Sequence, residues 1–221
     1  MNPNLALQWE RCPDGVELFD YGREPLRAAG MRSTILTDAA AKQGPWFRDR
    51  SPERVAASLN ISSLENPVVI SFVNARDDDA RCRFFSRYGF LLPGSELERS
   101  EALDTQAYFE RLLVEAGSAD PDAAAKAVNM ALASHRGFAL VATLELDDGL
   151  RLALKPQSLF AFILMEVAMV ALHGARLATC DHCGELFLTG PLTWRCSHAR
   201  FHADRCRVAA MRSRNANRAA K

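Results

Sequence analysis

The sequence has no apolar run long enough to cross a membrane as a helix. Its longest run, residues 159–172, has only 14 residues and is interrupted by Glu166, whereas a transmembrane helix needs about 20 apolar residues. We therefore expect a buried helix there and no membrane association. The N-terminus also lacks the basic region and apolar core of an export signal. We expect a cytoplasmic protein.

The common signatures of nucleotide-binding and hydrolytic enzymes are absent as well. The chain has no P-loop, no dinucleotide-binding glycine motif, no His-Glu-x-x-His motif and no nucleophile elbow. The three aspartates at positions 77–79 are candidates for metal binding, but negative charge is favourable at a helix N-terminus, and we interpret them as a helix cap. These absences count against an enzyme without deciding the question.

Charge of one sign is not in excess over the whole chain, because 27 basic residues balance 27 acidic ones. The two ends differ, however: residues 180–221 have eight basic and three acidic residues, and residues 1–179 have 19 and 24. Such an asymmetry indicates that the basic end meets an anion or meets the acidic body itself, unless it is only a solvated charged end. Lysine is scarce, with four residues against 23 arginines, and arginine suits phosphate contact.

With 48% hydrophobic residues, the chain has enough apolar side chains for a packed core. The pattern predicts an α+β fold, in which a mixed body of helices and hairpins, residues 1–175, precedes a small zinc finger, residues 176–221. The body is a candidate for binding a small ligand or a protein partner.

In the first part of the body the local signals are short. We expect strands or loop anchors at residues 16–19 and 33–36, and a turn with aromatic anchors at 44–47. Ser51 and Pro52 are typical of a helix start and predict a helix ending near Leu59. The β-branched run at 67–73 predicts a strand.

The second part of the body has clearer periodicity. Helices are predicted at residues 77–88, 100–116 and 122–134. Alternating apolar residues at 138–146 and 150–154, separated by Asp147-Asp148-Gly149, predict a β-hairpin with one apolar face. Ser158 then opens the apolar helix 159–172, which Gly174 ends and which we expect at the centre of the body.

The cysteines are clustered in a way that indicates metal binding rather than a disulfide framework. Cys180 and Cys183 are two residues apart and precede Gly184, so both thiolates of a tight turn can face one ion. Eighteen residues further on come His202 and Cys206, whose spacing places them one turn apart on one helix face. The sequence therefore predicts one structural zinc ion (Zn²⁺) bound by Cys180, Cys183, His202 and Cys206.

Between the two ligand pairs we expect a short hairpin over residues 185–195, with a small core made by Phe187, Trp194 and Phe201. We call the turn that holds Cys180 and Cys183 the knuckle. A knuckle, then a hairpin, then a helix with the last two ligands form a treble-clef-like arrangement. The alternatives are buried free cysteines, or a different fourth ligand, for which the competitors are Cys196, His182 and His198. Of these, Cys196 is the main one.

This segment resembles the fingers of a group of uncharacterised bacterial proteins related to the CGNR-type zinc-finger family. The family has Cys-x2-Cys-Gly, two phenylalanines and Cys-x3-Cys-Arg, and the matching residues are Cys180, Cys183, Gly184, Phe187, Gly190, Phe201, Cys206 and Arg207. His202 stands where the family has cysteine. The resemblance covers about a quarter to a third of the chain and implies a role in nucleic-acid binding or regulation.

The end of the chain carries five arginines near the second ligand pair: Arg205, Arg207, Arg212, Arg214 and Arg218. On a helix they form two stripes, which can contact phosphates on both sides of a groove. We expect a DNA-binding transcriptional regulator, with RNA as a related possibility. The alternative is a protein–protein interaction module whose zinc is purely structural. A nuclease is the third reading, with His198 and Asn215 as its only nearby candidates.

Overall fold

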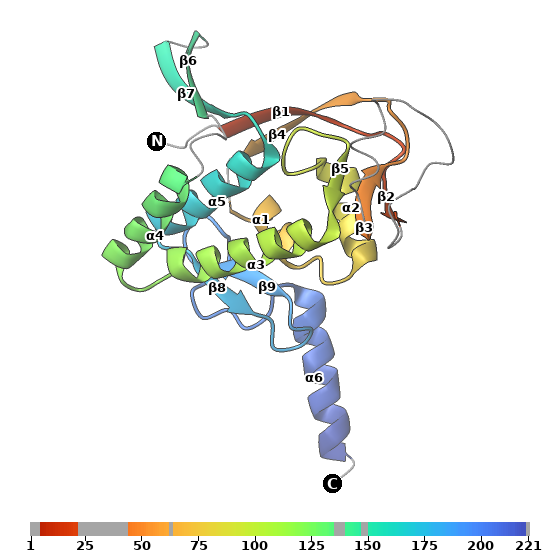
Figure 1. Ribbon diagram of the computed structural model, residues 1–221. Coiled ribbons are helices and arrows are strands. Elements are labelled where there is room, and N and C mark those ends of the chain that lie inside the picture. The colour runs from red at the N-terminus through yellow and green to blue at the C-terminus, as the bar shows by residue number, and fades with distance from the viewer. Residues whose placement is uncertain (1–4, 22–43, 62–63, 135–139, 147–149, 220–221) are drawn as a thin grey trace, which may run out of the picture.

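The computed structural model describes residues 5–21, 44–61, 64–134, 140–146 and 150–219, with the backbone alone for 5–9, 57–61, 140–146, 150–155 and 217–219. Within them the chain is a mixture of helices and small antiparallel sheets, which confirms the predicted α+β class (Figure 1). The predicted strand at 33–36, the turn at 147–149 and the apolar face of the hairpin lie outside the described residues or side chains. None of the described helices has both the length and the apolar character to cross a bilayer.

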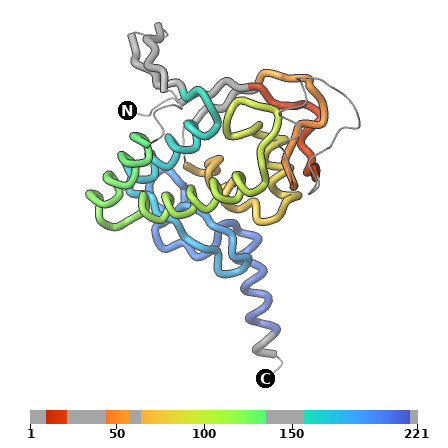
Figure 2. Tube along the Cα trace, viewed as in Figure 1, coloured from red at the N-terminus to blue at the C-terminus, as the bar shows by residue number. Residues whose placement is uncertain are grey.

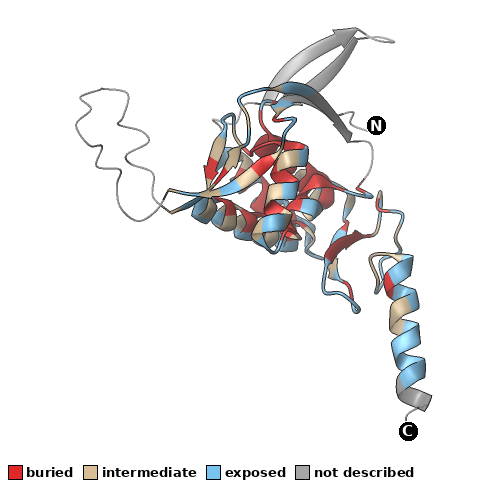
Figure 3. Cartoon of the chain, turned by 90° about the vertical axis from the view of Figure 1, so that its right-hand side faces the viewer, coloured by how far each residue is buried: buried red, intermediate tan, exposed pale blue. Residues whose placement is uncertain are grey.

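The apolar run forms α5 (Leu159–His173) at the centre of the body, as the sequence predicts. The Ser158 side chain caps its N-terminus by accepting a hydrogen bond from the Ala161 N–H, and Gly174 ends it in the left-handed conformation (φ 63°). α5 packs against α3 (Arg99–Ala116) and α4 (Pro121–Ser134), both at their predicted positions. The buried face of α5 makes much of the core, which Figure 3 shows as the red centre of the body.

Residues 67–73 form a helix, α1 (Val68–Val73), and the predicted strand is wrong. The reason is a set of distant side chains that satisfy its free backbone groups. Glu166 of α5 accepts hydrogen bonds from the N–H groups of Val68 (2.9 Å) and Val69 (2.7 Å). At the other end, the amide of Gln106 on α3 donates to the carbonyls of Phe72, Val73 and Ala75. These partners lie far away in sequence, so a short apolar run gives no sign of them.

α1 is the hub of the molecule. It contacts α3, α5 and α2 (Asp78–Tyr88), and on its remaining side β9 (Leu186–Thr189). α2 is another confirmed helix, since Asp77 caps it by accepting from the Ala80 N–H at 2.6 Å and Gly89 follows it. The interpretation of the 77–79 aspartates as a cap is thus confirmed.

The N-terminal strands differ from the prediction in two places. β2 (Val16–Asp20), β3 (Pro45–Asp49) and β5 (Glu96–Glu98) form one antiparallel sheet, so residues 45–47 begin a strand rather than a turn, although Phe47 is a fully buried anchor. The predicted helix 51–59 is wrong, because β4 (Val55–Ile61) pairs along its whole length with β1 (Leu5–Arg11). This pairing joins segments about 50 residues apart, and local capping signals do not detect it.

The predicted hairpin beside the central helix is present as β6 (Leu140–Leu146) and β7 (Leu150–Pro156). After α5 the chain forms β8 (Arg176–Thr179), pairs it with β9, and ends in α6 (Asp204–Ala219). Figures 1 and 2 show β8 and β9 against the helical body, while α6 points away from it. Leu186 and Leu188 of β9 belong to the main hydrophobic core, so the hairpin whose turn holds Cys180 and Cys183 packs on the body.

Candidate metal centre

The first two cysteines lie in a tight turn that connects β8 to β9. The Cys180 N–H donates to the Glu185 carbonyl and the Gly184 N–H donates to the Cys180 carbonyl, both at 2.9 Å. Gly184 has φ +76°, a conformation that favours glycine and closes the turn. The knuckle is therefore the tip of the β8–β9 hairpin. The predicted hairpin over 185–195 is wrong, because β9 pairs with β8, and only Gly190 and Arg195 form an isolated bridge.

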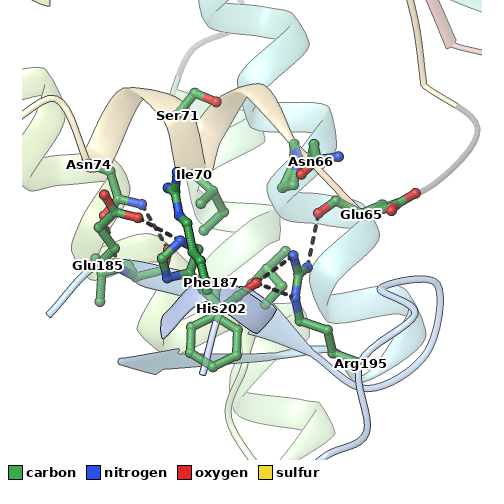
Figure 4. Close-up of a pocket in the computed structure, with 13 residues that line it drawn as sticks. Glu65, Asn66, Ile70, Ser71, Asn74, Glu185, Phe187, Arg195 and His202 are labelled. Carbon is green, nitrogen blue, oxygen red and sulfur yellow. Dashed lines mark hydrogen bonds and ion pairs between the residues drawn. The ribbon is translucent and has the colours of Figure 1, made fainter. Parts of the chain in front are cut away.

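His202 lies two residues before α6, and Cys206 lies in the first turn of that helix. The predicted common helix face is thus wrong in detail. The reason is that the His202 carbonyl accepts hydrogen bonds from Arg195 at 3.2 and 3.1 Å, while the Cys206 N–H donates to the Ala203 carbonyl instead. Arg195 fixes the backbone at His202, which sets the direction of its side chain (Figure 4).

The four predicted ligands are brought together. One ligand atom from each of Cys180, Cys183, His202 and Cys206 lies within 4.8 Å of the others, so this cluster is close enough to coordinate a metal ion. Cys180 and Cys206 are buried and pack with Phe187 and Phe201 in a small second core. The third predicted member of that core, Trp194, is 86% exposed, because its loop adopts left-handed conformations at Leu192 and Trp194 that turn the indole outward.

The distances among Cys183, His202 and Cys206 fit three corners of a tetrahedral site. For ligand bonds of about 2.3 Å to sulfur and about 2.0 Å to nitrogen, the tetrahedron edges are about 3.8 Å between two sulfurs and about 3.5 Å between sulfur and nitrogen. The two sulfurs of Cys183 and Cys206 are 3.8 Å apart, and the His202 Nδ1 lies 3.4 and 3.6 Å from them. The donor set and its spacing are compatible with zinc.

The second nitrogen of His202 has a carboxylate partner. Its Nε2 lies 3.1 Å from Glu185 Oε2, so a proton on Nε2 would be shared with this carboxylate and would leave the Nδ1 lone pair for a metal ion. A carboxylate in this position fixes the orientation of a metal-binding histidine and raises its basicity. The sequence analysis missed Glu185, although a carboxylate two residues after the knuckle was a usable signal.

Two thiols of the cluster, those of Cys180 and Cys206, have strongly shifted pKa values. Burial raises the pKa of Cys180, but hydrogen bonds from the backbone N–H groups of His202, Cys183 and His182 and from the His202 ring lower it, to about 6 overall. Burial and hydrogen bonds to Cys183 and Cys180 raise the pKa of Cys206 to about 11. The Cys180 thiolate forms readily and the Cys206 thiol resists ionisation beside it, and a divalent cation relieves this repulsion between thiolates.

The competing ligands lie outside the cluster. Cys196, His182 and His198 are exposed, and none of them belongs to the group of four. Cys12 and Cys82 lie elsewhere in the body, and all six cysteines are free.

The cluster is tied to the body by polar contacts around α1. The Asn74 side chain, at the end of α1, exchanges two hydrogen bonds with the backbone of Leu186 at 2.8 and 2.9 Å. The Leu64 N–H donates to the Leu192 carbonyl, and Arg195 donates to the Glu65 carbonyl at 3.1 Å. A cavity of about 320 Å³ remains in this seam and reaches Glu185 and His202 (Figure 4). The metal cluster is therefore connected to the body by backbone and side-chain hydrogen bonds.

The predicted nucleic-acid contacts lie on α6. Arg205, Arg207, Arg212 and Arg214 are all exposed, and the backbone of Arg218 continues the helix while its side chain lies outside the description. Arg207 lies 3.1 Å from Asp204 on its own helix, and this is the only ion pair of an α6 arginine within the described residues. The acidic body thus does not neutralise these arginines in the part of the chain that is described.

Comparison with protein-family models, with curated proteins and with solved structures gives no match for this chain. The resemblance to CGNR-type fingers stays a prediction.

Proposed function

We propose that this protein binds one zinc ion through Cys180, Cys183, His202 Nδ1 and Cys206, and that the zinc-anchored helix α6 binds DNA in a transcriptional regulator. A knuckle at a hairpin tip, combined with ligands at the start of a helix, is the arrangement of a treble-clef-like finger and supports the expected relationship to CGNR-type fingers. In this proposal the metal is structural, since four protein ligands fill a tetrahedral ion and leave no position for a substrate.

The observation that carries the DNA-binding proposal is the isolation of α6. The helix points away from the body, and its described arginines are exposed on two sides (Figures 1 and 3). A single 16-residue helix without packing partners is marginal in water, so its stability has to come from the anchored first turn and from a partner. Arginines on two sides make a polyanion the partner with complementary charge.

The test is a salt titration of binding to a fluorescent duplex of random sequence. If four arginines each contact one phosphate, the slope of log affinity against log salt is about −3.6, and affinity falls roughly 100-fold between 50 and 200 mM salt. The double substitution Arg205→Ala/Arg212→Ala should make the slope less steep by about 1.8.

A matched control removes the same charge elsewhere. Arg83 on α2 and Arg111 on α3 are exposed arginines of the body, so Arg83→Ala/Arg111→Ala should leave the slope unchanged. A wild-type protein that shows no binding to duplex DNA at 50 mM salt, or identical slopes for both double variants, would overturn the DNA-binding proposal.

A protein-interaction module is the second candidate, and one observation favours it. Trp194 lies in the loop between β9 and α6, is 86% exposed and has a left-handed backbone conformation (φ 57°). A tryptophan held in that conformation is typical of a contact surface. Loss of DNA binding in the experiment above, together with a full zinc site, would make this candidate the better one.

A further inference from the structure

The arginines of α6 divide its surface into two unequal arcs. At 100° per residue, Arg205 and Arg212 share one stripe and Arg207 and Arg214 share another, about 160° away. Cys206 lies near the middle of the wider arc, where the helix is attached to the metal cluster. The narrower arc is opposite this attachment and faces away from it.

The narrower arc contains Val208, Met211 and Asn215, together with Asp204 in the first turn, which pairs with Arg207, and the backbone position of Arg218 near the end of the helix. Val208 is 39% exposed, Met211 is 52% exposed, and Asn215 is exposed as well. Their spacing of three and four residues makes them one continuous ridge. Exposing two large apolar side chains to water on a solitary helix is unfavourable, so this ridge has the composition of a contact surface.

We propose that the ridge of Val208, Met211 and Asn215 reads base edges in the major groove of DNA, while the flanking arginine stripes bind the phosphates of the two strands. This inference rests on the proposed DNA-binding function and adds the residues that give sequence preference. A major groove about 12 Å wide admits one α-helix. The face of that helix that enters the groove contacts the bases, and the two sides of the helix contact the phosphate backbones.

The chemistry of the three side chains indicates which bases they prefer. Asparagine forms two hydrogen bonds with the N6 and N7 positions of adenine, and apolar side chains contact the thymine methyl group. From Val208 to Asn215 the helix rises about 10.5 Å, the length of about three base pairs. The expected site is therefore a short A·T-containing sequence.

The experiment is a selection of duplexes from a random pool with the full-length, zinc-loaded protein. The affinities of wild type, Asn215→Ala and Val208→Ala/Met211→Ala are then measured for the selected duplex and for a scrambled one. Alanine is the best helix former, so these variants do not weaken α6. Ser213→Ala, an exposed position on the wider arc, is the matched control.

The wild type should prefer the selected duplex, and Asn215→Ala should reduce that preference by about 5- to 150-fold while keeping the affinity for scrambled DNA within about twofold. Ser213→Ala should behave like the wild type. Salt-dependent binding with no enriched sequence, or a preference that Asn215→Ala and Val208→Ala/Met211→Ala leave unchanged, overturns the base-reading ridge and leaves the proposed function intact. Absence of binding to any duplex at low salt overturns the proposed function itself.

Discussion

Glu166 should make the stability of the protein depend on pH. Its carboxyl group is 1% exposed within the core and contacts the N-terminus of α1. Burial raises the pKa of Glu166 from 4.5 to about 8, although the N–H groups of Val69 and Val68 lower it. The folded state therefore retains a proton that the unfolded chain has already released, and the free energy of unfolding decreases as pH rises from 4.5 to about 8.

The size of the effect follows from the two pKa values. Between pH 5 and pH 8, keeping this proton costs the folded state about 3 kcal/mol relative to the unfolded chain. In Glu166→Gln the side chain is neutral at every pH and this dependence disappears. The difference in unfolding free energy, wild type minus variant, should thus fall by about 3 kcal/mol over this range.

Urea denaturation of both proteins at pH 5 and pH 8 measures this difference. Because both proteins carry the same cysteine cluster, the pH dependence of metal binding cancels when one is subtracted from the other. Glu115→Gln, an exposed glutamate on α3, is the control and should follow the wild type. Parallel stabilities of wild type and Glu166→Gln at the two pH values would refute the assignment of a raised pKa to Glu166.

Three further predictions concern the contacts that hold the metal centre and the hub helix. Glu185→Gln should weaken zinc binding by about 10- to 100-fold in a chelator competition, because His202 loses its carboxylate partner, and an unchanged affinity would contradict that role. Gln106→Ala removes the side-chain donor that the carbonyls of Phe72, Val73 and Ala75 share at the end of α1 and should lower the unfolding free energy by about 2–4 kcal/mol. Leu188→Ala should cost about 2–5 kcal/mol if β9 packs on the body core, whereas Leu172→Ala, at a position 75% exposed, should cost little; equal effects in thermal denaturation would argue against that packing.

The metal cluster could be predicted from the sequence because its information is local. Cys180 and Cys183 fit one turn, and His202 and Cys206 are close enough in sequence for any compact backbone to bring them together. What the sequence did not show was the backbone that does so. Arg195 donates a hydrogen bond to the His202 carbonyl, and α6 begins only at Asp204. This contact depends on how the loop between β9 and α6 folds.

The misassigned elements share a different cause. Residues 67–73 have the composition of a strand, and they form a helix because Glu166 and Gln106 satisfy both of its ends from 98 and 34 residues away. Residues 55–61 follow a helix-start signal, and they form a strand because β1 offers a complete antiparallel partner. The helices that were predicted correctly, such as α2 and α5, carry their own caps at Asp77 and Ser158.

The side chains that hold the finger on the body were also missed for lack of a local pattern. The side-chain amide of Asn74 forms hydrogen bonds with both the N–H and the carbonyl of Leu186, as a neighbouring strand would, although the two residues are separated by 112 positions. An asparagine after a short apolar run gives no sign of such a contact, so this role of Asn74 follows only from the packing of β9 on α1.

The central claim is a zinc ion bound by three sulfurs and one histidine nitrogen. X-ray absorption at the zinc edge of the protein, purified without a metal-affinity tag, measures the ligand set directly. We expect one zinc per chain with three sulfur neighbours at about 2.3 Å and one nitrogen at about 2.0 Å. A shell of four sulfurs would mean that Cys196 replaces His202, and a protein that contains no zinc, or a shell of oxygens, would contradict the metal centre.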